Sequence, residues 1–266
     1  MLSVTSAQLD TWLAALIFPL ARILGLISAA PFFSNRMIPV RVRLAVGLAA
    51  ALAVLPALPP MPPVPASSMM ALMILAQQTV IGIAIGFMMR VLFAAVDVAG
   101  ELIGLQMGLS FAVFFSPQTG GQTAVVTEFI GLLTLLIFVA LNGHLMLVNV
   151  VVVSFEWLPV GTLPKADGWM QIVAHAATMF ASALLMALPM IAALLITNIA
   201  LGVLTRAAPQ LNLFAIGFPV TLSVGFLVLL VSLNSFAPVL QSLFEHGFDA
   251  IDQMLRTFVG QASLQP

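Results

Sequence analysis

The chain has 266 residues, of which 62% are hydrophobic and 6% are charged, and its formal net charge is −1. An ordinary soluble domain carries about a quarter charged residues, so these few charges cannot build the polar shell of a soluble fold. The near-neutral charge excludes an electrostatic nucleic-acid binder, which needs a basic face. Cysteine is absent, which excludes disulfides, thiolate metal sites and cysteine nucleophiles. The composition predicts an all-α, polytopic membrane protein.

Residues 1–11 hold no Lys or Arg, so the charged part of a cleavable signal peptide is missing and the first apolar run is expected to be a retained helix. Six apolar stretches follow: residues 12–30, 43–58, 69–95, 126–153, 173–204 and 211–240. A spanning helix needs about 20 apolar residues, so most of them qualify, although the second is short. Prolines mark the breaks, because each one removes a backbone donor and clashes with the preceding turn. No polar linker divides the chain, which predicts a single integral membrane domain over residues 1–266.

One segment is longer than a bilayer requires. No proline interrupts residues 69–116, and a single helix of that length would extend about 70 Å, over twice the hydrocarbon core. Either the segment folds back in its glycine-rich part, or it is not confined to the bilayer.

The distribution of positive charge suggests an orientation. With six spans and the N-terminus outside, Lys165 and Arg256 lie outside, in agreement with the positive-inside rule. The arginines that then fall inside are Arg36, Arg41, Arg43, Arg90 and Arg206.

Glycines recur at helical spacing within the long segment. Gly100, Gly104 and Gly108 are four residues apart, and Gly82 and Gly86 form a second pair. This spacing clears a groove in which another helix backbone can approach closely. The alternative is that these glycines have no packing role and reflect only the apolar composition. Three glycines in register favour tight helix packing.

Ionisable residues inside apolar stretches are costly and normally face a partner or a water-filled cavity. Arg90, Asp97 and Glu101 share one helix face, either as a polar seam or proton relay, or as a mutually neutralising surface strip. Arg22 and Glu128 stand alone and are the better candidates for pairing with another helix or subunit. The residues assigned to a polar seam or to subunit pairing are Arg22, Arg90, Asp97, Glu101, Glu128 and Arg206.

Residues 107–121, MGLSFAVFFSPQTGG, are too few to span a bilayer and too apolar to lie in water. A phenylalanine cluster precedes a proline, between glycines that supply flexible ends. The segment is expected to pack into a cavity, of which a pore is one kind, and an ordinary buried loop fits the composition equally. The residues concerned are Gly108, Phe111, Phe114, Phe115, Pro117, Gly120 and Gly121.

The sequence contains no HExxH, GxSxG, P-loop or dinucleotide motif. His144, His175 and His246 are far apart, and a lone histidine in such a setting is more often a hydrogen-bonded packing residue than a ligand. We therefore expect no catalytic residue, metal site or cofactor, and an intramembrane hydrolase is disfavoured.

Three passages together resemble the FliR family, the flagellar type III export-gate component whose injectisome counterparts form the SctT family. The first is residues 22–43, RILGLISAAPFFSNRMIPVRVR; the second runs from GELIGLQMGLSFAVFFSP (residues 100–117) to FVALNGHLMLV (residues 138–148); the third is TRAAPQLNLFAIGFPV (residues 205–220). They cover nearly the whole chain in order and spacing. The Gly-Leu-Gln-Met-Gly motif favours the flagellar branch of the family over the injectisome branch. Ser116 departs from the acidic residue expected before the proline.

The resemblance implies a non-enzymatic gate subunit in the bacterial inner membrane, within the flagellar basal body. It implies FliP-like and FliQ-like partner subunits, an FlhB-like protein at the entrance, and unfolded flagellar proteins as cargo. Residues 108–122 would form a plug in the closed pore. Residues 1–165 would be the FliP-like part, and residues 166–266 a FliQ-like helical hairpin with a C-terminal tail.

A proton- or ion-coupled small-solute transporter is the alternative hypothesis, with Arg90, Asp97, Glu101 and Glu128 as relay groups. Transporters commonly show inverted-repeat symmetry. Here the two halves differ, because prolines punctuate the first half while the second predicts a smooth hairpin.

Overall fold

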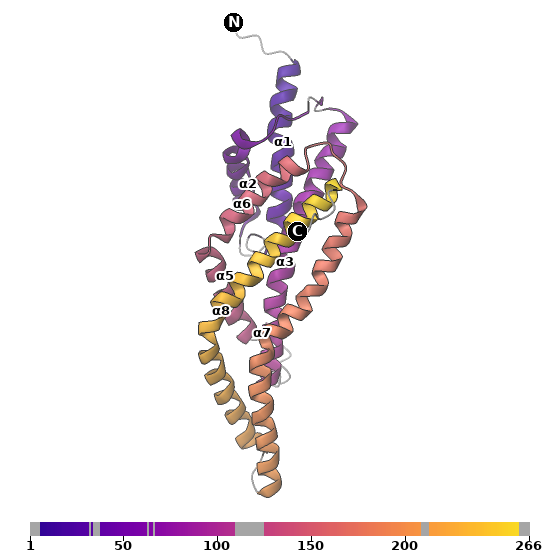
Figure 1. The fold of residues 1–266 in the computed structure, drawn as a ribbon. Helices are drawn as coiled ribbons and strands as arrows, with labels where there is room; N and C mark the ends of the chain where they lie inside the picture. The colour runs from indigo at the N-terminus through magenta and orange to yellow at the C-terminus, as the bar shows by residue number, and fades with distance from the viewer. Residues whose placement is uncertain are drawn as a thin grey trace. The chain divides into compact units, whose positions relative to one another are not determined.

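A computed structural model describes residues 6–31, 33, 38–62, 64–65, 67–109, 125–208 and 213–260. Over these residues the chain forms helices and no strand, which confirms the all-α prediction. In chain order the elements are α1 (Ser6–Ala29), α2 (Val40–Val54), the 3-10 helix η1 (Leu55–Ala57), α3 (Met69–Gln106), α5 (Val125–Ala140), α6 (Gly143–Trp157), α7 (Ala166–Ala207) and α8 (Leu213–Val259). Figure 1 labels the α-helices and colours them along the chain from indigo to yellow.

The long segment after the proline-rich connection does not fold back at its glycines. α3 is a single helix of 38 residues, about 57 Å at 1.5 Å per residue, which exceeds the roughly 30 Å hydrocarbon core. It ends at Gln106, and Gly108, two residues further on, has a φ of 77°, a left-handed conformation that favours glycine. The Gly108 amide donates to the Leu105 carbonyl (3.1 Å), and the Leu109 amide donates to the Gly104 carbonyl (3.1 Å). These two bonds form a Schellman cap, which satisfies the last carbonyls of the helix.

The apolar stretch at residues 126–153 forms two helices, α5 and α6, with a break at Leu141 and Asn142. Asn142 has a φ of 57°, a left-handed conformation that asparagine tolerates better than most residues. Its carbonyl accepts the Leu145 amide (2.9 Å) and the Met146 amide (3.1 Å), which starts α6. The Asn-Gly pair breaks the helix without any proline.

α7 and α8 both extend beyond the apolar stretches that predicted them. They contain 42 and 47 residues, and the turns added at the end of α8 are amphipathic rather than uniformly apolar. In the last part of α8 the buried residues recur at spacings of three and four: Phe248, Ile251, Leu255 and Phe258. That pattern is typical of a helix with one face against a core. Prolines at 189, 219 and 238 lie inside these helices without ending them.

The described chain divides into two compact units, each made of several segments. Unit 1 comprises residues 1–91, 142–176 and 245–266, and unit 2 comprises residues 92–141 and 177–244. Each unit therefore combines segments from both halves of the sequence.

Each unit has its own apolar core. In unit 1, Ala14 and Phe18 of α1 form a buried cluster with Ala71 and Ile74 of α3. In unit 2, the rings of Phe93 (α3), Phe138 (α5) and Phe244 (α8) contact one another, with centroid distances of 5.2 to 5.8 Å. Two of the three contacts are edge-to-face, an arrangement that is worth about 0.5–1.5 kcal/mol beyond the area it buries.

Five described helices are long and apolar enough to cross a bilayer, and α5 with α6 would provide a sixth span if the pair is one broken span. Within the most apolar windows, 61% of the α3 residues are buried, against 17% in α2, 22% in α7 and 17% in α8. α3 is therefore a core helix, whereas α2, α7 and α8 direct most of their apolar surface outward. This confirms the prediction of a polytopic membrane protein.

Candidate functional site

A fully buried arginine connects three helices of unit 1. Arg22 of α1 has no exposed surface. Its Nε donates to Oε1 of Gln78 on α3 (2.8 Å), and its Nη1 donates to Oγ of Ser154 on α6 (2.9 Å). Its Nη2 donates to the carbonyl of Leu158, at the end of α6 (2.9 Å). One side chain thus crosslinks α1, α3 and α6; we call these four residues the arginine node.

Helix α6 supplies most of the electrostatic compensation for this charge. Leu158 is the residue that caps the C-terminus of α6, where the helix dipole is negative and favours a cation. The guanidinium also lies 3.8 Å from the centre of the Phe155 ring, whose face is electron-rich. Ser154 can accept from Arg22 because its own hydroxyl donates to the Val151 carbonyl (2.6 Å). A buried charge is tolerated only when it is hydrogen-bonded in this way.

Glycines let α1 and α3 approach closely beside the node. A Cβ added to Gly82 would collide with the Arg22 carbonyl oxygen, and one added to Gly25 would collide with the Thr79 carbonyl oxygen. A Cβ at Gly86 would lie 2.7 Å from the carbonyl oxygen of Leu26. The structure therefore places Gly82 and Gly86 at a backbone-to-backbone contact, which only glycine permits without separating the helices.

The connection from α6 to α7, residues 158–165, also contacts the end of α8, near the C-terminus of the chain. The Lys165 amide donates to the Phe258 carbonyl in α8 (2.9 Å), and the Phe258 ring packs on Trp169 at 4.8 Å. Arg256, paired with Asp252, stacks over the Trp157 ring at 4.0 Å. In unit 1, the end of α6, the connection and the start of α7 thus all contact the end of α8.

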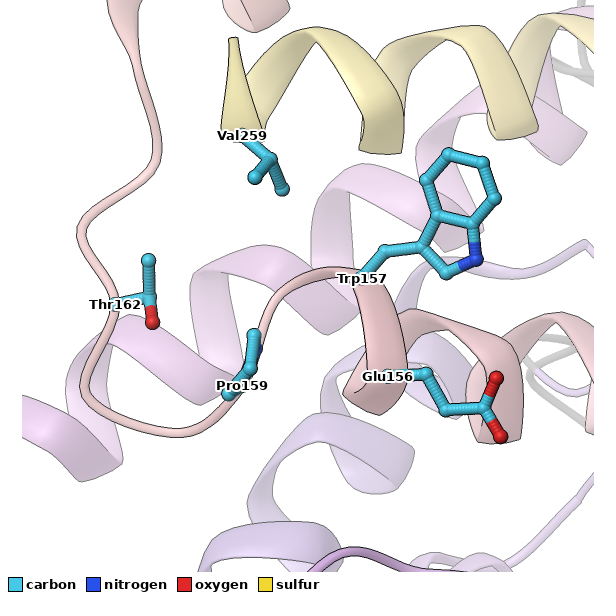
Figure 2. A pocket seen from close by; sticks show the side chains of 5 residues that line it. All are labelled: Glu156, Trp157, Pro159, Thr162 and Val259. Carbon is cyan, nitrogen blue, oxygen red and sulfur yellow. The ribbon is translucent and has the colours of Figure 1, made fainter. Parts of the chain in front are cut away.

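An open surface pocket lies where these segments meet (Figure 2). Glu156, Trp157, Pro159 and Thr162 come from the end of α6 and the connection that follows, and Val259 comes from the end of α8. The lining provides one carboxylate, one hydroxyl and an indole. It contains no nucleophile paired with a base, and no group of three His, Asp or Glu residues placed to hold a metal occurs in the described part of the chain.

Unit 2 carries the remaining predicted acidic residues. Asp97 and Glu101 are exposed on α3, Glu128 is exposed in the first turn of α5, and both glutamates act electrostatically on Asp97. We call these three residues the acidic cluster. Like charges four residues apart on a helix destabilise it, so Asp97 and Glu101 repel each other. Arg90 is exposed in unit 1, so its seven-residue spacing to Asp97 runs across the boundary between the units.

The other predicted glycines lie near the end of α3. A Cβ on Gly100 would lie 2.6 Å from the Cα of Thr127, so α5 packs directly on α3 at this point. Gly104 is buried within α3, and Gly108 forms the helix cap rather than a packing groove.

The remaining predicted residues are placed as follows. Arg206 is exposed in the last turn of α7. His144 begins α6, its Nδ1 has no hydrogen-bond partner among the described residues, and His175 is buried in α7. The remaining plug residues lie outside the described residues: Phe111, Phe114, Phe115, Pro117, Gly120 and Gly121.

The partners of Arg22 were not predicted from the sequence. Gln78 is a polar residue inside an apolar stretch and was the one available signal. Ser154 and Leu158 carry no such signal, because a serine or a backbone carbonyl near a helix end is common.

Comparison with known proteins identifies the family. Residues 13–247 match the family described as bacterial export proteins, family 1. The chain is 42% identical over 256 residues to the flagellar biosynthetic protein FliR of Escherichia coli strain K12, covering 96% of this chain and 98% of that protein. It is 29% identical over 239 residues to FliR of Bacillus subtilis strain 168, covering 88% and 92%. The chain belongs to the FliR family of bacterial export proteins.

The part that matches the FliR family contains the arginine node, the glycines of the α1–α3 contact and the acidic cluster. Arg256 and Phe258, at the end of α8, follow the matched region. The candidate site is thus a set of helix-to-helix contacts among the described residues.

Proposed function

We propose that this chain is a non-enzymatic subunit of the flagellar type III protein-export gate and forms part of the pore through which unfolded flagellar proteins pass. The observation that carries the proposal is the nearly full-length similarity to FliR proteins. The described geometry agrees with it, since charged residues are used for packing within unit 1. The gate would lie in the bacterial inner membrane, at the flagellar basal body.

FliP-like and FliQ-like subunits, with an FlhB-like protein, are the proposed partners. α7 and α8 are about 63 and 70 Å long and leave most of their apolar surface exposed. A bilayer core of about 30 Å covers less than half of such a helix. Apolar helices of neighbouring subunits would cover the rest.

The acidic cluster is proposed to pair with a basic side chain of a neighbouring subunit. Asp97, Glu101 and Glu128 are exposed, and the two glutamates both act on Asp97 with a charge of the same sign. A cation from a partner would relieve the repulsion and would be held by two helices at once. The need for a cation from outside the cluster favours a subunit interface over a proton relay, which requires further proton acceptors along a path.

Residues 108–122 are proposed to form the plug of the closed pore. Two features of the described chain support this. Gly108 ends α3 with a specific cap, and α5 begins at Val125 with Thr127 packed against Gly100. Both ends of the intervening segment therefore leave one helix pair of unit 2.

The subunit assignment is tested by affinity purification of the tagged chain from its own membranes, followed by mass spectrometry of intact complexes. Co-purifying FliP-like and FliQ-like chains are expected. Solute uptake by the purified chain alone in liposomes, abolished by Asp97→Asn, would instead establish the transporter hypothesis.

The plug assignment is tested by deleting residues 111–115 and measuring the leakage of small solutes across membranes that contain the assembled complex. Leakage is expected to rise while the partners still co-purify. Unchanged leakage in assembled complexes would refute the plug and leave the subunit assignment standing.

A further inference from the structure

The three tryptophans of the chain gather at one end of unit 1. Trp12 lies near the start of α1, Trp157 at the end of α6 and Trp169 near the start of α7. These helix ends are adjacent, because Ala14 of α1 belongs to a buried cluster that Val160, in the connection between α6 and α7, also contacts. Tryptophan is enriched at the membrane–water interface, where its ring meets apolar surroundings and its N–H meets polar ones.

The charged residues at this end stop where long apolar runs begin. Between Asp167 and Arg206, α7 contains no Asp, Glu, Lys or Arg, and α1 contains none between Asp10 and Arg22. Met170, just inside the run of α7, has a relative exposure of 68%. A change from charged to apolar residues that is marked by tryptophans is typical of the boundary between water and a bilayer. This end of unit 1 is therefore expected to lie at a membrane surface.

The pocket in Figure 2 lies at the same end, between the α6–α7 connection and the end of α8. Its volume is about 490 Å³, within the roughly 300–1,000 Å³ of small-molecule sites. Glu156 lines the pocket. Lys165 lies beside it, because a Cβ added to Gly260 would collide with the Lys165 Nζ, and Gly260 directly follows Val259 of the lining. Neither Glu156 nor Lys165 forms an ion pair with another described residue, so the pocket has an available charge of each sign.

The connection that lines the pocket is held in place by two helices. Gln77 of α3 donates to the Thr162 carbonyl, and the Lys165 amide donates to the Phe258 carbonyl of α8 (2.9 Å). The Thr162 amide also donates to the Pro159 carbonyl (3.1 Å). The Thr162 hydroxyl makes no hydrogen bond with another described residue, so it remains an acceptor on the lining. The pocket is thus formed before any ligand binds.

The lining favours one kind of ligand. Arg256 already stacks over the Trp157 ring at 4.0 Å, so the polar contacts of a ligand fall to the Glu156 carboxylate and the Thr162 hydroxyl. Both accept hydrogen bonds, which a primary ammonium group supplies through three N–H donors. A quaternary ammonium group has no N–H, and a headgroup with only negative charge would be repelled by the carboxylate. Lys165 supplies a positive charge for a phosphate.

We propose that this pocket holds the headgroup of a phospholipid with a primary ammonium group, of the ethanolamine kind. The ammonium group donates to Glu156 and Thr162, and the phosphate lies at Lys165. The acyl chains run along the exposed apolar surface of α7 that begins at Met170. The lipid site goes beyond the proposed export function and does not depend on it.

A comparison of lipids tests the headgroup. Assembled complexes purified in mild detergent are incubated with phosphatidylethanolamine, phosphatidylcholine or phosphatidylglycerol of identical acyl chains, and the retained lipid is counted by native mass spectrometry. The ethanolamine lipid is expected to be retained at one more molecule per copy of this chain than either of the other two. Equal retention of the three lipids would overturn the proposal.

Substitutions test whether that lipid occupies the pocket. Glu156→Gln is expected to lower retention of the ethanolamine lipid severalfold and to abolish its preference over the glycerol lipid. Lys165→Met is expected to lower it as well, because the phosphate loses its cation. The matched control is Asp167→Asn, which removes an exposed carboxylate from the first turn of α7 outside the lining and should change nothing.

Two results with the variants would contradict the lipid site. One is an equal effect of Glu156→Gln and Asp167→Asn on lipid retention. The other is a protein lost from Glu156→Gln complexes while lipid retention stays unchanged, which would assign the pocket to a basic side chain of a partner.

Fluorescence quenching tests the lipid contact with the pocket intact. In Trp12→Phe/Trp169→Phe, Trp157 is the one remaining tryptophan of the full chain, which is reconstituted alone into vesicles. An ethanolamine lipid brominated near the glycerol end of its acyl chains is expected to quench Trp157 more strongly than the equally brominated choline lipid. Equal quenching by both lipids, or none by either, would show that Trp157 is not beside an ethanolamine lipid.

Discussion

The Arg22 guanidinium carbon lies 3.8 Å from the centre of the Phe155 ring, while the same group donates hydrogen bonds to the residues on either side of that ring, Ser154 and Leu158. The end of α6 therefore contacts one buried charge in three ways: through the Ser154 hydroxyl, the Phe155 ring and the Leu158 carbonyl. A desolvated cation–π contact is worth about 2 kcal/mol, and a hydrogen bond to a charged group about 1.5–3 kcal/mol. The arginine node is accordingly expected to dominate the stability of unit 1.

Replacing Arg22 tests this expectation. Arg22→Met is expected to lower the stability of the detergent-solubilised chain by about 3 kcal/mol or more, because Gln78 and the Leu158 carbonyl lose their donor while buried. Arg22→Lys keeps the charge but cannot reach three acceptors in different directions, so it is expected to restore only part of the loss. Thermal unfolding followed by the fluorescence of Trp157 and Trp169, both in unit 1, measures the difference.

A matched control uses the other stacked arginine of unit 1. Arg256→Ala removes an exposed ion pair and an exposed stacking contact, so about 1 kcal/mol or less is expected. Equal losses for Arg22→Met and Arg256→Ala would contradict the dominant role of the node.

The α1–α3 contact predicts opposite signs for two identical substitutions. Gly82→Ala is expected to destabilise by about 1–3 kcal/mol, because the new Cβ meets the Arg22 carbonyl and the helices must separate. Gly202→Ala has open space and is expected to stabilise by up to about 1 kcal/mol, since alanine is the better helix former. Urea titration of the two variants checks the signs, and the same sign for both would show that Gly82 is not at a contact.

Removing a charge from the acidic cluster is expected to act differently on the free chain and on the complex. Asp97→Asn relieves repulsion by Glu101 and Glu128, so the isolated chain should gain about 0.5 kcal/mol at low salt. The gain should shrink at high ionic strength, since exposed charges are screened. Recovery of partner subunits should fall, because the proposed basic partner loses one acceptor.

Asp167→Asn, at the exposed start of α7 in unit 1, is the control for this effect. It removes the same charge without touching the cluster, and partner recovery should stay unchanged. A loss of partners with both variants would argue against a specific pairing site.

The cap of α3 predicts a backbone effect. Gly108→Asn should be tolerated, whereas Gly108→Val should cost about 1–2 kcal/mol, because a β-branched residue is strained at a φ of 77°. Hydrogen–deuterium exchange of the peptide spanning residues 100–109 measures this as faster exchange in the valine variant. Indistinguishable exchange in Gly108→Asn and Gly108→Val would contradict the cap.

Particular residues show how far sequence reasoning extends. Arg22 is conspicuous because a charge within an apolar run needs a partner, yet its partners on α6 lie over 130 residues away and carry no distinctive chemistry. The break at Asn142 was missed because hydropathy continues smoothly through it, although an Asn-Gly pair is a turn signal. The last turns of α8 were missed because an apolar-run criterion finds lipid-facing helices, whereas these turns are amphipathic.

The length of α3 marks the opposite case. The sequence of residues 69–116 predicted either a fold-back at the glycines or a helix not confined to the bilayer, and α3 is one helix over Met69–Gln106. Each glycine inside the helix costs about 1 kcal/mol, and the packing of α5 on Gly100 offsets that cost. Composition alone does not reveal that packing.

The spacing of the arginine node has a consequence for biosynthesis. Gln78 follows Arg22 by 56 residues, and Leu158 follows it by 136. At about 5–20 residues per second, ribosomes need roughly 7 to 27 s to make those 136 residues, so α1 leaves the ribosome well before the α6 acceptors of Arg22 have been made. During that interval the Arg22 side chain lacks two of its three hydrogen-bond acceptors. The order of translation therefore makes the contacts of the first helix with α6 among the last to form in unit 1.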